Sequence, residues 1–134
     1  ERSAQRIIKG IEEANCPICH VLGERKNPLE YLKAADAFCL CSTYEGMPIS
    51  LIEAMGVGTI PVCTPVGGII NVVKDGETGF LSSDISEEAY YIALKRFLQQ
   101  SDSDAAEMKA KVKESYKPFT MRECASKYVE LYSK

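Results

Sequence analysis

The sequence contains 134 residues, of which 46% are hydrophobic and 26% are charged, and its formal net charge is −3. This length and composition are typical of one soluble globular domain, so we expect residues 1–134 to form a single domain. Sixteen Lys and Arg stand against nineteen Asp and Glu. The main electrostatic contribution to binding a nucleic-acid backbone is therefore missing, and nucleic acid is not expected as a partner.

The first part of the chain is predicted to alternate between helix and strand. Isoleucines at helical spacing among charged residues indicate an amphipathic helix over residues 4–14. A short strand that ends in glycine is expected at residues 18–23, and a brief helix that begins with proline at residues 28–35. Residues 37–41 are nearly all apolar, which is typical of a strand covered on both faces in a parallel sheet.

The middle of the chain continues this alternation. A helix ended by two glycines is expected at residues 48–55, and a strand at residues 60–63. A short helix at residues 69–73 and a short strand at residues 80–81 follow, separated by a cluster of turn residues. The order of the elements therefore predicts an α/β fold with a parallel sheet.

The last third of the chain is predicted to be helical. Ser86 is expected to cap one helix, and further helices are expected at residues 104–116 and 120–132. The side chains of the first of these helices that are expected to face the core are Tyr90, Ala93, Leu94, Phe97 and Leu98. Lysines along the second helix are interrupted by glutamates, which indicates a solvated face rather than a basic binding surface.

Six cysteines raise the question of a disulfide framework. Cys39 and Cys41 alternate within an apolar run and Cys63 ends another, so we expect these thiols to be reduced and buried. Cys16 and Cys19 have the spacing of a redox motif, but a strand rather than a helix N-terminus is expected after them. Redox chemistry is therefore the less favoured interpretation.

The sequence has no stretch of about 20 apolar residues, so no transmembrane segment is expected. Its first residues lack both a methionine and the apolar core of a signal peptide. We therefore expect a cytoplasmic location and interpret the sequence as a piece of a longer protein.

The segment from Tyr44 to Gly56 joins an apolar strand to a helix. In open α/β sheets ligands bind beyond the carboxyl ends of the strands, where a helix N-terminus offers free N–H groups to a phosphate. Gly46 permits a close approach of the backbone, and Pro48 fits the first helical turn without wasting a donor. The backbone donors are expected around Met47, Ile49 and Ser50.

Two carboxylates flank this phosphate position. Glu53 lies five residues beyond Pro48, roughly 7–8 Å along a helix, where it can accept hydrogen bonds from two ribose hydroxyls. Glu45 precedes the helix and can hold hydroxyls of a sugar attached to the diphosphate. Taken singly, each glutamate is also compatible with an ordinary surface charge. However, Glu53 stands among apolar residues, so we expect something polar to meet it.

Several ordered motifs resemble the C-terminal donor-binding domain of GT-B glycosyltransferases of family 4, also called group 1. The matching stretches are Ala35-Asp36-Ala37-Phe38, Ser42, Glu45-Gly46-Met47-Pro48, Glu53-Ala54-Met55, Gly67-Gly68 and Asp75-Gly76-Glu77-Thr78-Gly79-Phe80-Leu81. Glu45 and Glu53, with seven residues between them, match the paired-glutamate motif of that family.

This resemblance implies a Rossmann-like, three-layer α/β/α fold that is the incomplete C-terminal half of a GT-B enzyme. It also implies a retaining transfer of a hexosyl group from a UDP- or GDP-linked sugar, without a cofactor or metal ion. The acceptor, a glycan or a lipid-linked molecule, would bind an N-terminal domain missing here. The pathway would be synthesis of a cell-surface polysaccharide or glycoconjugate, on the inner face of the membrane if the missing part associates with it.

Carried over to this chain, the resemblance implies that Glu45 contacts the donor sugar and Glu53 the ribose. The backbone of Gly46, Met47, Pro48 and Ile49 would bind the diphosphate and the sugar. Further candidates for the pocket are Ser42, Gly67, Gly68, Val21, Gly23 and Glu24, the last three beside the base. No catalytic residue is assigned to this chain.

The sequence departs from the family at two points. Asn71 stands where the family often has an acidic residue after the paired glycines. The family's Arg and Lys, which neutralise the leaving diphosphate, have no counterpart, and no Lys or Arg occurs between Lys33 and Lys74. Because charge on a leaving diphosphate is normally stabilised by cations, we expect the isolated chain to bind donor weakly without turning it over.

Two other classes of function remain open at this stage. One is a non-catalytic module that binds a sugar nucleotide or another protein. The other is a doubly wound signalling or redox domain, which would need an acidic phosphorylation pocket or a reactive thiol pair.

Overall fold

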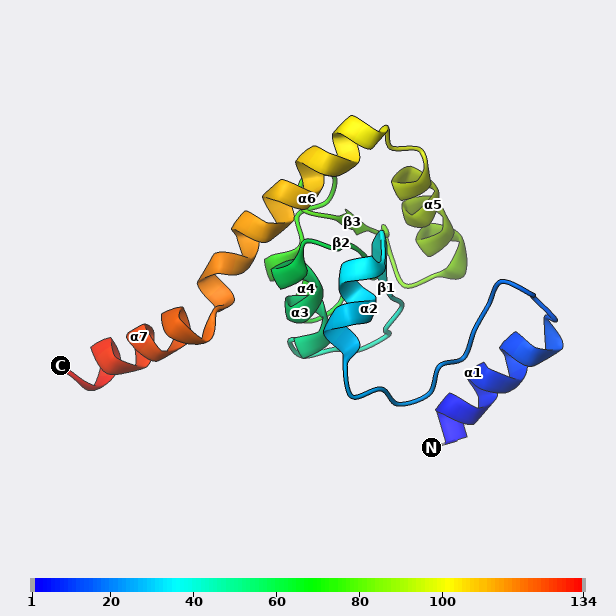
Figure 1. Ribbon diagram of the computed structural model, residues 1–134, viewed down its shortest axis with the longest axis horizontal. Coiled ribbons are helices and arrows are strands. Elements are labelled where there is room, and N and C mark those ends of the chain that lie inside the picture. Colours follow the sequence, from blue (N-terminus) through cyan, green and yellow to red (C-terminus); the bar gives the residue numbers. More distant parts are fainter. Residues whose placement is uncertain (1, 134) are drawn as a thin grey trace.

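A computed structural model describes residues 2–133, leaving aside the side chains of residues 2–4 and 7 (Figure 1). The elements in chain order are α1 (Arg2–Glu13), α2 (Pro28–Ala34), β1 (Ala37–Leu40), α3 (Ile49–Val57), β2 (Ile60–Cys63), α4 (Ile69–Val72), β3 (Phe80–Leu81), α5 (Glu87–Leu98), α6 (Asp102–Tyr116), the 3₁₀ turn η1 (Lys117–Phe119) and α7 (Met121–Tyr132).

The three strands form one parallel sheet in the order β1-β2-β3. Ala37 pairs with Ile60 at one end of the β1–β2 ladder, and Leu40 pairs with Cys63 at the other. In Figure 1 the sheet lies between α5 on one side and α2 and α3 on the other. The predicted α/β fold with a parallel sheet is therefore confirmed, and each crossover between strands contains a helix.

The core is centred on β2. All four residues of this strand are buried, because it has a strand on each side and helices over its faces. Leu51 and Met55 of α3 are fully buried against it together with Val112 of α6. Removing each large apolar side chain from water contributes roughly 1.5–3 kcal/mol, so this cluster holds α3 and α6 onto the sheet.

The strand expected at residues 18–23 is not formed. These residues are irregular, and the Ile18 side chain is 83% exposed. A strand needs a neighbour to satisfy its backbone groups, and within residues 2–133 none lies beside this segment. In Figure 1 this segment and α1 extend away from the sheet.

The expected burial of β1 was also wrong in part. Cys39 and Cys41 are exposed, whereas Cys63 is buried as expected. The physical reason is position: β1 pairs with β2 alone among the described strands, so only part of its surface is covered. Leu98 is likewise exposed rather than facing the core, because it is the last residue of α5 and the chain leaves the sheet there.

Helix α3 runs two residues further than predicted. Gly56 lies inside the helix with its Cα facing the Tyr116 ring, where a Cβ would stand 3.1 Å from a ring carbon. Gly58 is the C-cap, with a φ of +84°, a left-handed conformation that favours glycine. One of the two predicted glycine stops is therefore a packing site, and the other ends the helix.

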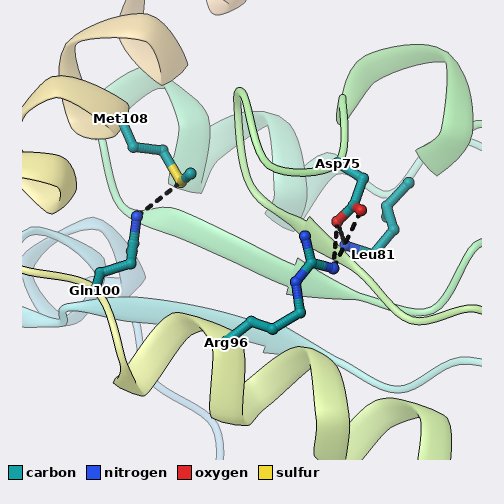
Figure 2. A network of polar contacts seen from close by, with 5 residues as sticks. All are labelled: Asp75, Leu81, Arg96, Gln100 and Met108. Carbon is teal, nitrogen blue, oxygen red and sulfur yellow. Dashed lines mark hydrogen bonds and ion pairs between the residues drawn. The ribbon is translucent and has the colours of Figure 1, made fainter.

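The turn between α4 and β3 is tied to α5 by Asp75. Arg96 of α5 donates two hydrogen bonds to its carboxylate, at 3.0 and 3.1 Å, and the Leu81 N–H donates a third at 2.9 Å (Figure 2). Figure 2 also shows the amide of Gln100 beside the sulfur of Met108, 3.7 Å away, where α5 gives way to α6. Asp75 therefore has a structural role at the end of the sheet.

The three C-terminal helices begin at hydroxyl caps. Ser86, Ser101 and Thr120 each accept a hydrogen bond from the backbone N–H three residues later. The cap at Ser101 explains why α6 begins two residues before the predicted start. Lysines of α6 pair with exposed acidic neighbours, in agreement with a solvated face. Of the helices that the structure describes, none has the length and apolar character needed to span a bilayer.

Candidate functional site

Two loops meet at the carboxyl edge of the sheet. Residues 41–48 follow β1 and residues 64–68 follow β2, and parallel strands bring both to the same edge. Thr64, directly after β2, donates its N–H to the Leu40 carbonyl at 3.1 Å and its hydroxyl to the Ser42 carbonyl at 2.6 Å. Hydrogen bonding between β1 and β2 thus continues beyond the strands and holds the two loops together.

Glu45 lies in the first of these loops and is half-buried. The Ser42 hydroxyl donates a hydrogen bond of 2.7 Å to Glu45 Oε1. One carboxylate oxygen is therefore held by the protein, and no described side chain donates to Oε2, which can accept hydrogen bonds from a ligand.

The glycine pair after β2 packs directly on the Glu45 loop. The Gly68 N–H donates to the Gly46 carbonyl at 2.6 Å. A Cβ at Gly68 would stand 2.5 Å from that oxygen, and one at Gly67 would stand 1.7 Å from the Glu45 carbonyl oxygen. The structure therefore brings Gly67 and Gly68 together with Glu45 and Gly46, and it gives the pair a packing role.

Helix α3 begins next to these loops without a side-chain cap. Pro48 is the N-cap residue, no side chain accepts from the first turn, and that turn contains no acidic residue. The N–H groups of Ile49 and Ser50 have no acceptor within the helix, because the first N–H groups of any helix lack one. Ile49 is 75% exposed, so this end of the helix faces the surface. Free donors and the positive end of the helix dipole together suit a phosphate.

Glu53 follows one turn further along α3. It is half-buried, while its neighbours Leu51, Ala54 and Met55 are fully buried. It is four positions after Ile49, which places both on the same face of the helix, roughly 6 Å apart along the axis. Among the side chains that the structure describes, Glu53 takes part in no ion pair. The expectation that something polar meets Glu53 stays a prediction.

The other candidates lie elsewhere. Val21, Gly23 and Glu24 are exposed on the irregular segment between α1 and α2, and no described hydrogen bond or ion pair joins them to residues 41–53. The largest of the described cavities, about 480 Å³, lies between the α4–β3 turn and α6 and is lined by Val72, Lys74, Glu77, Thr78, Glu107, Ala110, Lys111, Glu114 and Ser115. It contains none of the predicted site residues.

Sequence reasoning missed Thr64. This side chain is 3% exposed and links the two loops, yet a threonine after an apolar run gives no sign of function by itself. The available signal was its place, directly after the strand that proved to be central.

Comparison with known proteins identifies the family. Residues 3–115 match the family described as glycosyl transferases group 1. A glycogen synthase from Thermodesulfovibrio yellowstonii is 34% identical over 98 residues, which are 73% of this chain and 20% of that protein. An N-acetyl-alpha-D-glucosaminyl L-malate synthase from Bacillus anthracis is 29% identical over 116 residues, 83% of this chain and 29% of that protein.

Two solved structures share the fold. Sucrose-phosphate synthase from Thermosynechococcus elongatus superimposes with a TM-score of 0.84 at 26% identity, covering 98% of this chain and 34% of that one. The catalytic domain of starch synthase IV from Arabidopsis thaliana, bound to ADP and acarbose, gives a TM-score of 0.77 at 24% identity, covering 99% of this chain and 30% of that one. The chain thus spans about a fifth of the length of the glycogen synthase it matches and a third of these structures.

The family match, the parallel sheet with its two loops and the paired glutamates agree with one another. The chain belongs to the glycosyl transferases group 1 family and corresponds to the C-terminal, donor-binding domain of a GT-B glycosyltransferase.

Proposed function

We propose that this chain binds the nucleotide-sugar donor of a retaining glycosyltransferase at the carboxyl edge of its sheet. In this proposal Glu45 accepts hydrogen bonds from the donor sugar, and Glu53 accepts them from the ribose. The diphosphate lies between them on the backbone of residues 46–49. The observation that carries the proposal is the uncapped start of α3 flanked by two half-buried glutamates.

The chemistry of this site is binding and orientation. The N–H groups at the start of α3 can stabilise the diphosphate with the positive end of the helix dipole. Residues 34–73, which include both loops and α3, carry no Lys or Arg. Departure of a diphosphate develops negative charge that normally requires cations, so these residues alone supply only part of the stabilisation. We propose that the remainder comes from another part of the protein.

The whole protein would transfer a hexosyl group to a glycan or glycolipid acceptor held by an N-terminal lobe. Its relatives include a glycogen synthase and a synthase named for L-malate, so the class of acceptor varies among them. We place the reaction in the synthesis of a cell-surface polysaccharide or glycoconjugate in the cytoplasm, at the inner face of the membrane if the lobe associates with it. Transfer without a metal ion is part of the same proposal and predicts activity in the presence of a chelator.

A titration tests the binding proposal. Calorimetry or NMR would follow UDP-, GDP- and ADP-linked sugars added to the wild-type chain and to the Glu53→Ala variant, the ADP series being chosen because the starch synthase of the same fold is bound to ADP. Hydrogen bonds to a charged group contribute about 1.5–3 kcal/mol, so affinity should fall about 10- to 100-fold. Glu12→Ala, on the exposed face of α1, is the matched control. Equal affinity of wild type and Glu53→Ala would refute the ribose role.

The lack of cations in the loops favours a second candidate function, a sugar-nucleotide-binding module without catalysis. The two candidates differ in turnover by the full-length protein. We expect transfer by the full-length protein and none by this chain alone. Release of nucleoside diphosphate by the purified chain would contradict the second expectation, and inactivity of the full-length protein towards every donor it binds would favour the binding module.

A further inference from the structure

The loop that carries Glu45 is held by the neighbouring loop at three successive points. Thr64 binds the Ser42 carbonyl with its hydroxyl at 2.6 Å. Gly67 lies against the Glu45 carbonyl, and the Gly68 N–H binds the Gly46 carbonyl at 2.6 Å. The backbone on both sides of Glu45 is thus fixed to residues that follow the central strand.

Thr64 is a buried residue that joins the two loops. It is 3% exposed; its N–H donates to the last residue of β1, and its hydroxyl donates to the loop that follows. Its two acceptors, Leu40 and Ser42, are alternate residues, as they would be along a strand. An apolar side chain of the same shape, valine, lacks the hydroxyl, so it releases the Ser42 carbonyl with little change in the volume packed at this position.

Ser42 passes this constraint to the Glu45 side chain. Its carbonyl is bound by Thr64, and its hydroxyl donates to Glu45 Oε1 at 2.7 Å. A free glutamate side chain samples many rotamers, and ordering it on binding costs entropy. The Ser42 hydrogen bond removes part of that freedom before a ligand arrives, so the carboxylate is preorganised.

We propose that Thr64 and Ser42 are positioning residues that orient the Glu45 carboxylate towards the donor sugar, an inference that rests on the function proposed above. Neither residue needs to touch the donor for this effect. The diphosphate is assigned to backbone N–H groups at the start of α3, whereas the two hydroxyls bond to the Ser42 carbonyl and to Glu45 Oε1. Replacing either residue should therefore weaken the binding of a nucleotide sugar and leave the binding of the nucleoside diphosphate nearly unchanged.

The test compares the affinity for a nucleotide sugar with the affinity for the matching nucleoside diphosphate. Ser42→Ala and Thr64→Val should each weaken nucleotide-sugar binding about 3- to 10-fold, because the Glu45 side chain must then be ordered on binding, and should change nucleoside diphosphate binding less than about twofold. Thr64→Ser keeps the hydroxyl and should restore the wild-type ratio. An equal loss for both ligands would overturn the proposal, because it would indicate general disruption of the loops.

Thr59→Val is a matched control at the other end of β2. Thr59 precedes β2, is 3% exposed like Thr64, and donates its hydroxyl to the Leu32 carbonyl at 2.5 Å. Its loss removes the same kind of bond at the opposite end of the strand. Thr59→Val should leave the ratio of the two affinities unchanged, and a change equal to that of Thr64→Val would overturn the positioning role.

A second measurement needs no ligand. NMR side-chain couplings of Glu45 should show one dominant rotamer in the wild-type chain and rotamer averaging in Ser42→Ala. If Thr64→Val does not fold, Ser42→Ala and Thr64→Ser carry the test. A wild-type chain that binds neither ligand contradicts the proposed function, whereas identical Glu45 couplings in wild type and Ser42→Ala contradict the positioning role.

Discussion

The Cα of Gly67 rests against the carbonyl oxygen of Glu45 so closely that a Cβ would stand 1.7 Å from it. Gly67 also has a φ of +53°, in the left-handed region. Both facts exclude a larger residue here, since the contact is with backbone that cannot rotate away. The position of a candidate ligand-binding residue therefore depends on the glycine that packs against its backbone.

Gly67→Ala should therefore destabilise the chain and displace the Glu45 loop. Overpacking and an unfavourable φ together should lower the free energy of unfolding by about 2–4 kcal/mol, measured by urea denaturation. Gly10→Ala is the control, because Gly10 lies inside α1 with nothing within 4 Å of a Cβ. That substitution should stabilise the helix by about 0.5–1 kcal/mol. Similar stabilities of the two variants would contradict the packing described here.

Gly46→Ala, in contrast to Gly67→Ala, should leave the stability of the chain nearly unchanged and should reduce its affinity for the donor. A Cβ at Gly46 would meet nothing within 4 Å, and its φ is not in the left-handed region. The free energy of unfolding should change by no more than about 0.5 kcal/mol. If the backbone of Gly46 approaches the diphosphate, the added methyl group should reduce donor affinity by at least about tenfold. Calorimetry with a nucleotide sugar checks this, and undiminished affinity would remove Gly46 from the proposed site.

Asp75→Ala should reduce stability without changing donor affinity. It removes the ion pair in which Nη1 of Arg96 donates to both carboxylate oxygens, and also the hydrogen bond from the Leu81 N–H. The side chains of the pair are 40% and 45% exposed, so the pair and the hydrogen bond together should contribute about 1–2 kcal/mol. Asp36→Ala is the control, because its pair with Lys109 is more exposed and should contribute no more than about 0.5 kcal/mol. Thermal unfolding of both variants measures the difference.

The cysteines should differ sharply in their reaction with iodoacetamide. Burial raises the pKa of Cys63 to about 12, so this thiol should be labelled only after unfolding. A hydrogen bond from the Cys19 thiol lowers the pKa of Cys16, so its reactive thiolate should be present at lower pH than for an ordinary cysteine. Mass spectrometry of labelled peptides across a pH series measures both.

Cys19→Ala tests the cause of this reactivity. Without the Cys19 hydrogen bond, the pH profile of Cys16 labelling should move to higher pH. Cys41→Ala removes another exposed thiol and should leave that profile unchanged. A profile that stays in place in Cys19→Ala would show that the hydrogen bond does not control Cys16.

Elements with strong local signals were predictable. The strand at residues 60–63 was placed correctly because its apolar run is bounded by turn residues, and Ser86 was identified because a serine before acidic residues caps a helix. The failures depended on neighbours. The segment 18–23 has the composition of a strand, but strand formation requires a partner that the described residues do not supply. Cys39 was expected to be buried because its run is apolar, and it is exposed because β1 is covered by one neighbouring strand.

The sequence by itself determined the type of each central element, the family resemblance and the pair Glu45 and Glu53, because these depend on local composition and on spacing along one chain. Only the tertiary structure decided which residues hold Glu45. Thr64 and Gly67 lie about twenty residues away in the sequence, and they reach the Glu45 loop because parallel strands bring the carboxyl ends of β1 and β2 together. Hydrogen bonds between separate loops leave no periodic trace in a sequence, so no pattern could have revealed them.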